Sequence, residues 1–283
     1  MEFTRLPQKL NYLTKPLYEE VFSGDKGAFS DYYYKEVAPE STIYVAWEPS
    51  DPASDSESGT QKTGGSEDAQ VSSKKSEYPS DPDQIKSMIH LNPYTLLWNG
   101  EETRIPYIVA VATRESLRHR GLMRELLTII FGDLKTAHVP FAFLMPINEA
   151  IYRPFGFRRT WSWQWEEEVM GGSPGDTRKS ADLCTDEELQ ELSDHVNQEL
   201  SGRCELFTKR TVPYYRRLIK EQKASDGSLL VWSRGGHPIA AGQTGKEEYP
   251  PMMCRIMDRE AYEKRLQGPG DEPFQHAYVC EVV

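Results

Sequence analysis

A run of basic residues precedes a glycine within the stretch YIVAVATRESLRHRGLMRELL, residues 107–127. Arg118, His119 and Arg120 come directly before Gly121, and apolar residues recur at helical spacing after it. The first turn of a helix has unpaired backbone N–H groups and the positive end of the helix dipole. A glycine there lets an anion approach the backbone closely, and arginines add positive charge. The stretch therefore predicts a phosphate-binding site, with a solvated basic turn as the alternative that the spacing leaves open.

The elements that must position this loop follow from the apolar residues around it. Tyr107 to Thr113 is a nearly continuous apolar run, which is typical of a strand buried on both faces. Residues 121–136 repeat apolar side chains at helical spacing, and Phe141 to Met145 is a second buried strand. A short helix is predicted around Glu149 to Arg153. The predicted order is strand, basic loop, helix, strand and short helix.

Beyond these elements the chain alternates predicted helices with predicted strands. Residues 50–83 interrupt the pattern, because their only apolar side chains are Ala53, Ala69, Val71 and Tyr78. Such a stretch buries too little surface to offset its ordering entropy, so residues 50–83 are predicted to be a disordered insertion. The other predicted helices span 15–22, 26–34, 185–200, 210–224 and 259–266, and the other strands span 42–47, 88–91, 94–98, 161–169, 228–233, 238–241 and 252–257.

Several motifs resemble those of a known superfamily. The buried strand, the Arg-x-x-Gly-x-small loop and the following helix resemble the acetyl-CoA-binding motif of the GNAT N-acetyltransferases. The stretch MPINEAIYRPFGF, residues 145–157, is similar to the strand, short helix and Tyr-x-x-Phe-Gly-Phe of the same superfamily. HLNPYTLLWNG and IYRPFGF together resemble, more particularly, the Enhanced-intracellular-survival-like (Eis-like) acetyltransferases of bacteria. The resemblance runs from Leu17 to Trp165, apart from the insertion.

The resemblance implies a fold and a set of domains. It implies an α/β (α+β) protein, in which a GNAT-type mixed central sheet flanked by helices is followed by a smaller, incomplete α+β C-terminal region. Residues 1–169 would form the acetyl-CoA-binding domain. Residues 170–245 would be a shortened second GNAT-like region, and residues 246–283 the start of a sterol-carrier-like domain.

The resemblance also implies roles for residues at matching positions. Val111, Ala112 and Thr113 match the strand end that holds the pantetheine arm of acetyl-CoA, where the strand splays from its neighbour and leaves backbone groups free. Ile147 and Asn148 match a second stretch that lines this co-substrate. The residues assigned to the pyrophosphate-binding loop are Arg118, His119, Arg120, Gly121, Leu122, Met123 and Arg124. No metal is implied, and neither His90 nor His237 has metal-ligand partners nearby in the sequence.

Two residues carry the implied catalysis. Tyr152 matches the tyrosine to which the family assigns the role of general acid, which protonates the departing CoA thiolate. A phenol can donate that proton, and a thiolate whose pKa is about 8.5 can accept it. Taken without the resemblance, the residue type favours a packing aromatic. Family members use a terminal carboxylate as general base; here that group would be Val283, for which a solvated tail end is the favoured alternative.

The overall composition narrows the function classes. The chain has 283 residues, of which 38% are hydrophobic and 27% charged, as is typical of soluble globular proteins. Its net charge of −11 argues against binding nucleic acid and suits cationic substrates. No segment approaches the roughly 18 apolar residues of a membrane span, and no signal peptide is evident. With four widely separated cysteines, the chain is expected in the cytoplasm.

Two functions from different classes remain. The first is an N-acetyltransferase that uses acetyl-CoA, in which a primary amine of a small molecule or a lysine attacks the thioester directly in a ternary complex. The second is a non-catalytic protein that binds acetyl-CoA or CoA and acts through interaction or regulation. Release of free CoA on incubation with amines separates the two. The relatives are oligomeric, which leaves formation of a homo-oligomer open.

Overall fold

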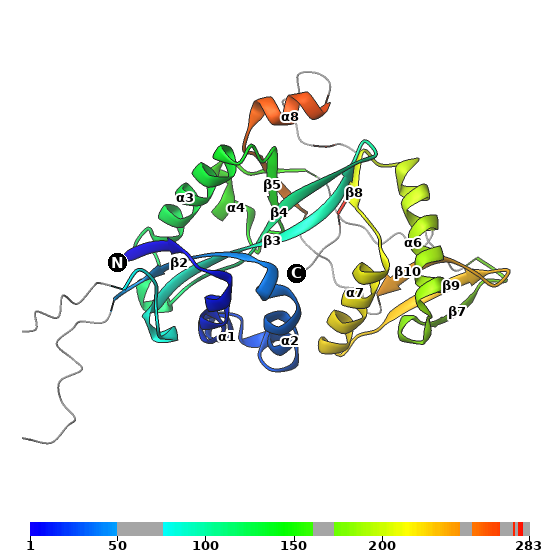
Figure 1. Ribbon diagram of the computed structural model, residues 1–283, viewed down its shortest axis with the longest axis horizontal. Coiled ribbons are helices and arrows are strands. Elements are labelled where there is room, and N and C mark those ends of the chain that lie inside the picture. Colours follow the sequence, from blue (N-terminus) through cyan, green and yellow to red (C-terminus); the bar gives the residue numbers. More distant parts are fainter. Residues whose placement is uncertain (50–75, 161–172, 244–250, 267–273, 275–276, 280–283) are drawn as a thin grey trace, which may run out of the picture.

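The structure is a computed structural model that describes residues 1–49, 76–160, 173–243, 251–266, 274 and 277–279. The predicted strand 161–169, the bulk of the predicted insertion and Val283 lie outside the described residues. Figure 1 shows a larger lobe built on a long sheet and a smaller lobe that contains α6, α7 and a second sheet. No helix in the described ranges is both long and apolar enough to cross a membrane.

A mixed sheet forms the centre of the larger lobe. Among the described residues it has nine strands in the order β1-β2-β3-β4-β5-β11-β6, with β8 paired to β3 and β12 to β8. Its pairs are antiparallel except for β4 with β5 and β8 with β12. The strands are β1 (Glu2–Arg5), β2 (Thr42–Trp47), β3 (Ile85–Trp98), β4 (Glu101–Thr113), β5 (Phe141–Leu144), β6 (Arg158–Arg159), β8 (Leu206–Thr208), β11 (Met253–Ile256) and β12 (Ala277–Tyr278). The predicted α/β (α+β) class with a mixed, helix-flanked sheet is confirmed.

Helices cover both faces of this sheet. On one face, α1 (Lys15–Val21), α2 (Ala28–Tyr32) and the π-helical turn Tyr33–Val37 pack over an apolar cluster that contains Leu17 and Ile43. On the other face, α3 (Leu122–Thr136) and α4 (Glu149–Tyr152) close a second cluster. Apolar residues of α3 recur every three or four positions, so this helix presents one continuous stripe to the sheet.

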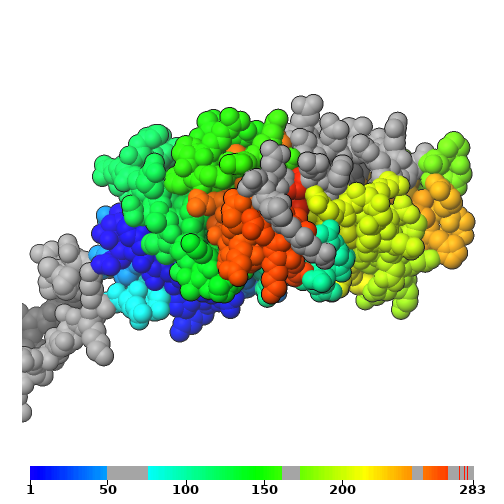
Figure 2. Space-filling model, turned by 90° about the horizontal axis from the view of Figure 1, so that it is seen from above, coloured from blue at the N-terminus to red at the C-terminus, as the bar shows by residue number. Residues whose placement is uncertain are grey.

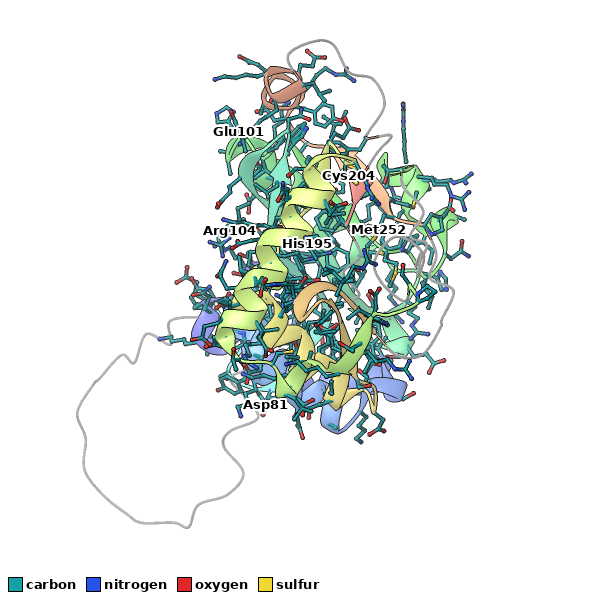
Figure 3. All side chains as sticks on the ribbon, turned by 90° about the vertical axis from the view of Figure 1, so that its right-hand side faces the viewer. Asp81, Glu101, Arg104, His195, Cys204 and Met252 are labelled. Atoms are coloured by element: carbon teal, nitrogen blue, oxygen red, sulfur yellow. The ribbon has the colours of Figure 1, made fainter. Side chains whose placement is uncertain are left out.

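The smaller lobe joins the larger one through strand pairing and helix contacts. Helices α6 (Asp186–Ser201) and α7 (Val212–Ala224) pack on the three-stranded sheet β10 (His237–Gln243), β9 (Leu229–Arg234) and β7 (Thr177–Ser180). The connecting strand β8 pairs with the end of β3. Figure 2, seen from above, shows α8 (Arg259–Leu266, orange) on the near face of the molecule, and Figure 3 shows Glu101 of the β3–β4 hairpin beside it. Arg265 of α8 forms an ion pair with Glu101.

Some predicted elements differ from the observed ones. The two strands predicted at 88–91 and 94–98 are a single strand, β3, because the extended backbone that precedes and includes Pro93 continues the pairing with β4. The helix predicted at 26–34 is shorter and passes into a π-helical turn. A regular turn also precedes Ile85, inside the predicted insertion: Asp81 caps a 3₁₀ turn at Pro82–Gln84. The strands β1, β7 and β8 were not predicted, because each is short and carries little apolar alternation.

The segment predicted to begin a sterol-carrier-like domain, residues 246–283, also contributes to the central sheet. Strand β11 lies between β5 and β6, and Met253 of β11 pairs with Leu144 of β5 and Arg159 of β6. The predicted domain boundaries themselves stay a prediction. The pairing places Met253–Ile256 in the same layer as the strands around the basic loop.

Replacing Thr185 by alanine should destabilise the smaller lobe. The sequence predicts a capping box from Thr185 and Glu188, and the structure has it: the Glu188 N–H donates to Thr185 Oγ1 at 3.2 Å, and the Thr185 N–H donates to Glu188 Oε2 at 2.9 Å. Loss of such a cap costs about 1 kcal/mol. Thermal unfolding of Thr185→Ala should show a lower Tm, while Thr185→Ser, which keeps the acceptor, should not.

Candidate functional site

The parallel strands β4 and β5 separate soon after they meet. They pair at Tyr107 and Phe143, whose rings stack with centroids 4.8 Å apart. β4 continues to Thr113, whereas β5 ends at Leu144 and pairs along its other edge with β11. In the described part of the chain, the edge of β4 from Ile108 to Thr113 therefore has no partner strand. Its backbone N–H and C=O groups face the gap between the two strands.

A bulge in β4 lies at this gap. The register of β4 with β3 shifts between Met88 and His90, so that Ala110 and Val111 both lie opposite Ile89. Ala110 has a φ of 49°, a left-handed conformation that is uncommon for a residue with a Cβ. Bulges bend a strand and are frequent beside functional sites. The bulge lies beyond Tyr107, the position at which β4 pairs with β5.

The basic loop ends where α3 begins. Gly121 is the N-cap, with a φ of 86°, and a Cβ built on it would meet nothing within 4 Å. His119 is also left-handed, with a φ of 63°. The Glu125 N–H donates to the Gly121 carbonyl at 3.1 Å as the helix begins, and the earlier first-turn N–H groups have no partner within the helix. An anion in front of Gly121 would therefore meet open backbone donors and the positive end of a 15-residue helix.

Positive side chains surround this helix terminus. Arg118, His119, Arg120 and Arg124 are all exposed. Arg118 Nε donates to the Thr113 carbonyl at 3.4 Å, which ties the loop to the end of β4. The Arg124 guanidinium lies 5.2 Å from the centroid of the Phe155 ring. Guanidinium groups beside unpaired helical N–H groups are suited to phosphate.

The short helix α4 holds Tyr152 against the α3 side of the sheet. Asn148 caps this helix, because its Oδ1 accepts from the Ala150 N–H at 2.9 Å. Tyr152 is 7% exposed, and its ring meets the Phe157 ring edge-on, with centroids 6.1 Å apart. Burial raises the pKa of Tyr152 to about 12, so its phenol is protonated at neutral pH. Ile147, which precedes the cap, is 90% exposed.

Four of the residues predicted for the site lie in one apolar cluster, and Ala112 lies in another. Val111, Leu122, Met123 and Tyr152 all contribute to one apolar cluster beneath α3. Ala112 points to the opposite face of the sheet and is buried there, while its carbonyl accepts from the Ser87 hydroxyl at 2.8 Å. The roles assigned to these residues stay predictions, and Val283 lies outside the described residues.

A cavity of about 750 Å³ opens at the bulge, on the α1–α2 side of the sheet. The segment Tyr107–Ala110 and Met145, just after β5, form its floor. Aromatic rings of the first two helices form one wall, and the C-terminal turn of α7 with the following residues forms the opposite wall. Figure 1 shows α1, α2 and α7 below the sheet, with α2 facing α7. The cavity thus connects to the strand gap from the side opposite to α3.

A buried polar cluster lies behind the cavity. The Tyr33 hydroxyl, whose residue lines the cavity, is 2.9 Å from His90 Nδ1 and donates to Asn92 Oδ1 at 3.2 Å. The Ser41 hydroxyl donates to the same oxygen at 2.7 Å. Burial lowers the pKa of His90 to about 3, so the imidazole is neutral at physiological pH. These bonds tie the segment after α2 to β3 next to the bulge.

The sequence did not point to the residues of the cavity. Its wall residues Tyr18, Phe29 and Glu221 lie on predicted helices, but nothing in their spacing separates a cavity wall from ordinary core packing. Among the described residues, no group of three His, Cys, Asp or Glu side chains is placed to hold a metal ion.

Comparisons with known proteins agree with this geometry. A family profile described as an acetyltransferase (GNAT) domain matches residues 70–160, which include β3, β4, the basic loop, α3, β5 and α4. No curated protein matches the sequence significantly. The chain therefore contains a GNAT acetyltransferase domain, the domain of an acyltransferase.

Solved structures share the fold over almost the whole chain. A protein of unknown function from Enterococcus faecalis, described as a probable N-acyltransferase, has a TM-score of 0.61 at 11% identity; the match covers 93% of this chain and 74% of that one. Eis1 from Mycobacterium abscessus has a TM-score of 0.54 at 10% identity, covering 92% and 75%. A GCN5-related N-acetyltransferase from Anabaena variabilis also scores 0.54 at 10% identity, covering 92% and 60%.

Proposed function

We propose that this protein is an N-acetyltransferase that transfers the acetyl group of acetyl-CoA to a primary amine by direct attack in a ternary complex. The observation that carries the proposal is the unpaired edge of β4 from Ile108 to Thr113, which lies between the cavity and the start of α3. The family match over residues 70–160 supports acetyl transfer as the chemistry. An Eis-like specificity belongs to the same proposal and rests on the sequence resemblance and the shared fold.

Acetyl-CoA suits the strand gap and the basic loop for physical reasons. The amides of its pantetheine arm can pair with an unpaired strand edge in the manner of an added strand. Its pyrophosphate suits a helix N-terminus that begins at a left-handed glycine and is flanked by arginines. We assign Val111, Ala112 and Thr113 to the pantetheine arm, Arg118, His119, Arg120, Gly121, Leu122, Met123 and Arg124 to the pyrophosphate, and Ile147 and Asn148 to the neighbouring part of the co-substrate.

In the proposed reaction the acceptor enters through the cavity at the bulge. A neutral amine nitrogen attacks the thioester carbonyl carbon, the new C–N bond forms and the C–S bond breaks. Backbone N–H groups near Val111 polarise the carbonyl and stabilise the charge that develops on its oxygen. The cavity holds the amine next to the edge of β4, which makes the attack effectively intramolecular.

Tyr152 acts on the leaving sulfur in this scheme. Its pKa of about 12 keeps the hydroxyl protonated, so it can donate to the thiolate as the C–S bond breaks. A free thiol has a pKa of about 8.5, so the phenol is the weaker acid of the two. A Tyr152 phenolate that forms during the transfer therefore takes up a proton again and does not persist. The sulfur keeps the proton that Tyr152 donates, and the proton lost by the attacking nitrogen passes to solvent, from which Tyr152 regains its own.

The test of this proposal is thiol release. The protein is incubated with acetyl-CoA and a panel of primary amines, and free CoA is followed with a thiol reagent. An acetyltransferase releases CoA only when one or more of the amines are present. One molecule of acetylated amine then appears for each molecule of CoA released. A protein that binds acetyl-CoA in a titration but releases no CoA with any amine would contradict the proposal and favour a non-catalytic, CoA-binding role.

A further inference from the structure

Arg255 is a half-buried cation on the α3 side of the central sheet, and it comes from outside the segment that matches the acetyltransferase profile. It lies on β11 and pairs in register with Ala142 of β5. Its guanidinium carbon is 3.9 Å from the centroid of the Phe131 ring of α3. Burial lowers the pKa of Arg255 from its ordinary value, and no acidic side chain of the described residues offsets this effect.

The guanidinium of Arg255 holds the turn that follows Tyr152. Its Nη1 donates to the carbonyl of Phe155, the last residue of the 3₁₀ turn Arg153–Phe155 directly after α4. The turn ends at Gly156, which has a φ of 81°, and a Cβ built on this glycine would lie 3.5 Å from Arg255 Nη1. The turn therefore lies directly against the guanidinium, and the left-handed glycine lets the chain leave it.

Aromatic rings link the same guanidinium to Tyr152 by a second route. The Phe131 ring that Arg255 contacts lies 6.1 Å from the Phe157 ring, measured between centroids. The Phe157 ring in turn meets the Tyr152 ring edge-on at 6.1 Å. Arg255 thus contacts both α3 and the turn after α4, and it holds the two elements together around Tyr152.

A contribution to stability does not by itself account for an arginine at this position. A half-buried charge loses hydration, and replacing such a group by an apolar side chain of similar volume is often neutral for stability. An arginine differs from that side chain in geometry, since its planar group can donate in the plane while its face packs on a ring. Here the acceptor belongs to the Tyr152 turn and the ring to α3, so the arginine fixes one element relative to the other.

We propose that Arg255 is a positioning residue for the general acid, which holds the Tyr152 hydroxyl where the CoA sulfur departs. The inference rests on the proposed function for the role of Tyr152, but the contact of Arg255 with the turn is measurable without turnover. Arg255 acts through Phe155 and Phe131. Strand β11 then completes the catalytic arrangement of a domain whose profile match ends at residue 160.

Arg210, which directly precedes the N-cap of α7, offers a matched control. Its Nη1 donates to the Thr208 carbonyl at 3.1 Å, and its guanidinium carbon lies 4.6 Å from the centroid of the Tyr214 ring. Arg255→Met and Arg210→Met thus each remove one guanidinium, one bond to a backbone carbonyl and one contact with an aromatic ring. Thermal unfolding checks that the variants fold. The lysine variants, which keep the charge but lose the planar group, replace the methionine variants where these do not fold.

Hydrogen–deuterium exchange of residues 149–157 is the first measurement, and it needs no substrate. The backbone of this segment should exchange at least about tenfold faster in Arg255→Met than in the wild type, because a hydrogen bond from a charged group no longer restrains its opening. Arg210→Met should leave the exchange of this segment unchanged.

Turnover is the second measurement. Arg255→Met should lower kcat for thiol release on the order of 10- to 100-fold, since a displacement of about 1 Å is enough for such a loss. Its affinity for acetyl-CoA should stay close to that of the wild type, because Arg255 meets α3 at Phe131, in the second half of the helix, and the proposed anion site is at its start. In a Tyr152→Phe background the same substitution should lower kcat far less, because the hydroxyl that Arg255 positions is already absent.

The outcomes separate this inference from the proposed function. Unchanged exchange of residues 149–157 in Arg255→Met, an equal increase in Arg210→Met, a wild-type kcat in Arg255→Met or a fully additive loss in the double variant would each overturn the role of Arg255. A wild-type protein that differs from Arg255→Met in exchange but releases no thiol with any amine would leave the contact with the Tyr152 turn standing and would contradict acetyl transfer instead.

Discussion

A Tyr152→Phe variant is expected to lose about 100-fold or more of its turnover while binding acetyl-CoA as tightly as the wild-type protein. The substitution removes one hydroxyl from a ring that is 7% exposed and packed against Phe157, so the shape of the cluster is kept. What is lost is the donor to the departing sulfur, and such general acid or hydrogen-bonding groups contribute about 100- to 10,000-fold. The measurement is kcat for thiol release, with the acetyl-CoA affinity from calorimetry.

Tyr44 provides the matched control for this variant. It is buried in the same cluster beneath α3, and its hydroxyl donates to Asp133 Oδ2 at 2.7 Å. Tyr44→Phe therefore removes a hydroxyl with a known protein partner and should lower stability by about 1 kcal/mol without changing kcat. If Tyr152→Phe keeps wild-type turnover, or if both variants lose turnover equally, Tyr152 does not act on the leaving group.

The pH dependence of turnover gives an independent test of Tyr152. Burial raises the pKa of Tyr152 to about 12, so the donor form is present throughout the range from about pH 6 to 10. The wild-type kcat should therefore show no decline that is due to Tyr152 below about pH 11. A descending limb near pH 8 that is absent from Tyr152→Phe would mean that the phenol ionises in the ordinary range and would contradict the assigned environment.

Local signals in the sequence were sufficient for many elements. The β-branched and aromatic run at Thr42–Trp47 is β2, and Thr185 with Glu188 marks the start of α6, because strand propensity and capping act over a few neighbouring residues. The same is true of the basic loop, since a glycine after basic residues and before an amphipathic helix is a local pattern. Gly121 is the N-cap of α3.

Long-range features could not be predicted in this way. Strand β11 pairs with the far edge of β5, although Leu144 and Met253 are distant in the sequence, and β4 pairs with the near edge only at Tyr107. The cavity depends on α7 lying opposite α2, and the Tyr32–Glu221 bond joins residues 189 positions apart. Nothing local to Glu221 distinguishes it from a solvated glutamate of an amphipathic helix. The candidate acetyl-CoA residues could therefore be predicted from the sequence, and the α7 wall of the cavity could not.

Placing a carboxylate at Gly121 should abolish acetyl-CoA binding. Gly121→Glu sets a negative charge directly in front of the first turn of α3, where the pyrophosphate is proposed to lie. The fold should persist, because a Cβ at this position meets no atom within 4 Å and a carboxylate at a helix N-terminus is favourable. The positive φ of 86° adds strain of about 1–2 kcal/mol to any non-glycine residue there, so the charge must be separated from the strain.

Gly121→Gln makes that separation, because glutamine has the shape of glutamate and the same backbone strain but no charge. Two charges about 4 Å apart near a protein surface interact by about 4 kcal/mol, and solvent screening at this exposed loop reduces that value. Calorimetric titration should therefore show the glutamate variant binding acetyl-CoA on the order of 100-fold more weakly than the glutamine variant. Equal affinities would mean that the pyrophosphate does not approach Gly121, and the anion site at α3 would have to be abandoned even if the unpaired edge of β4 still held the pantetheine arm.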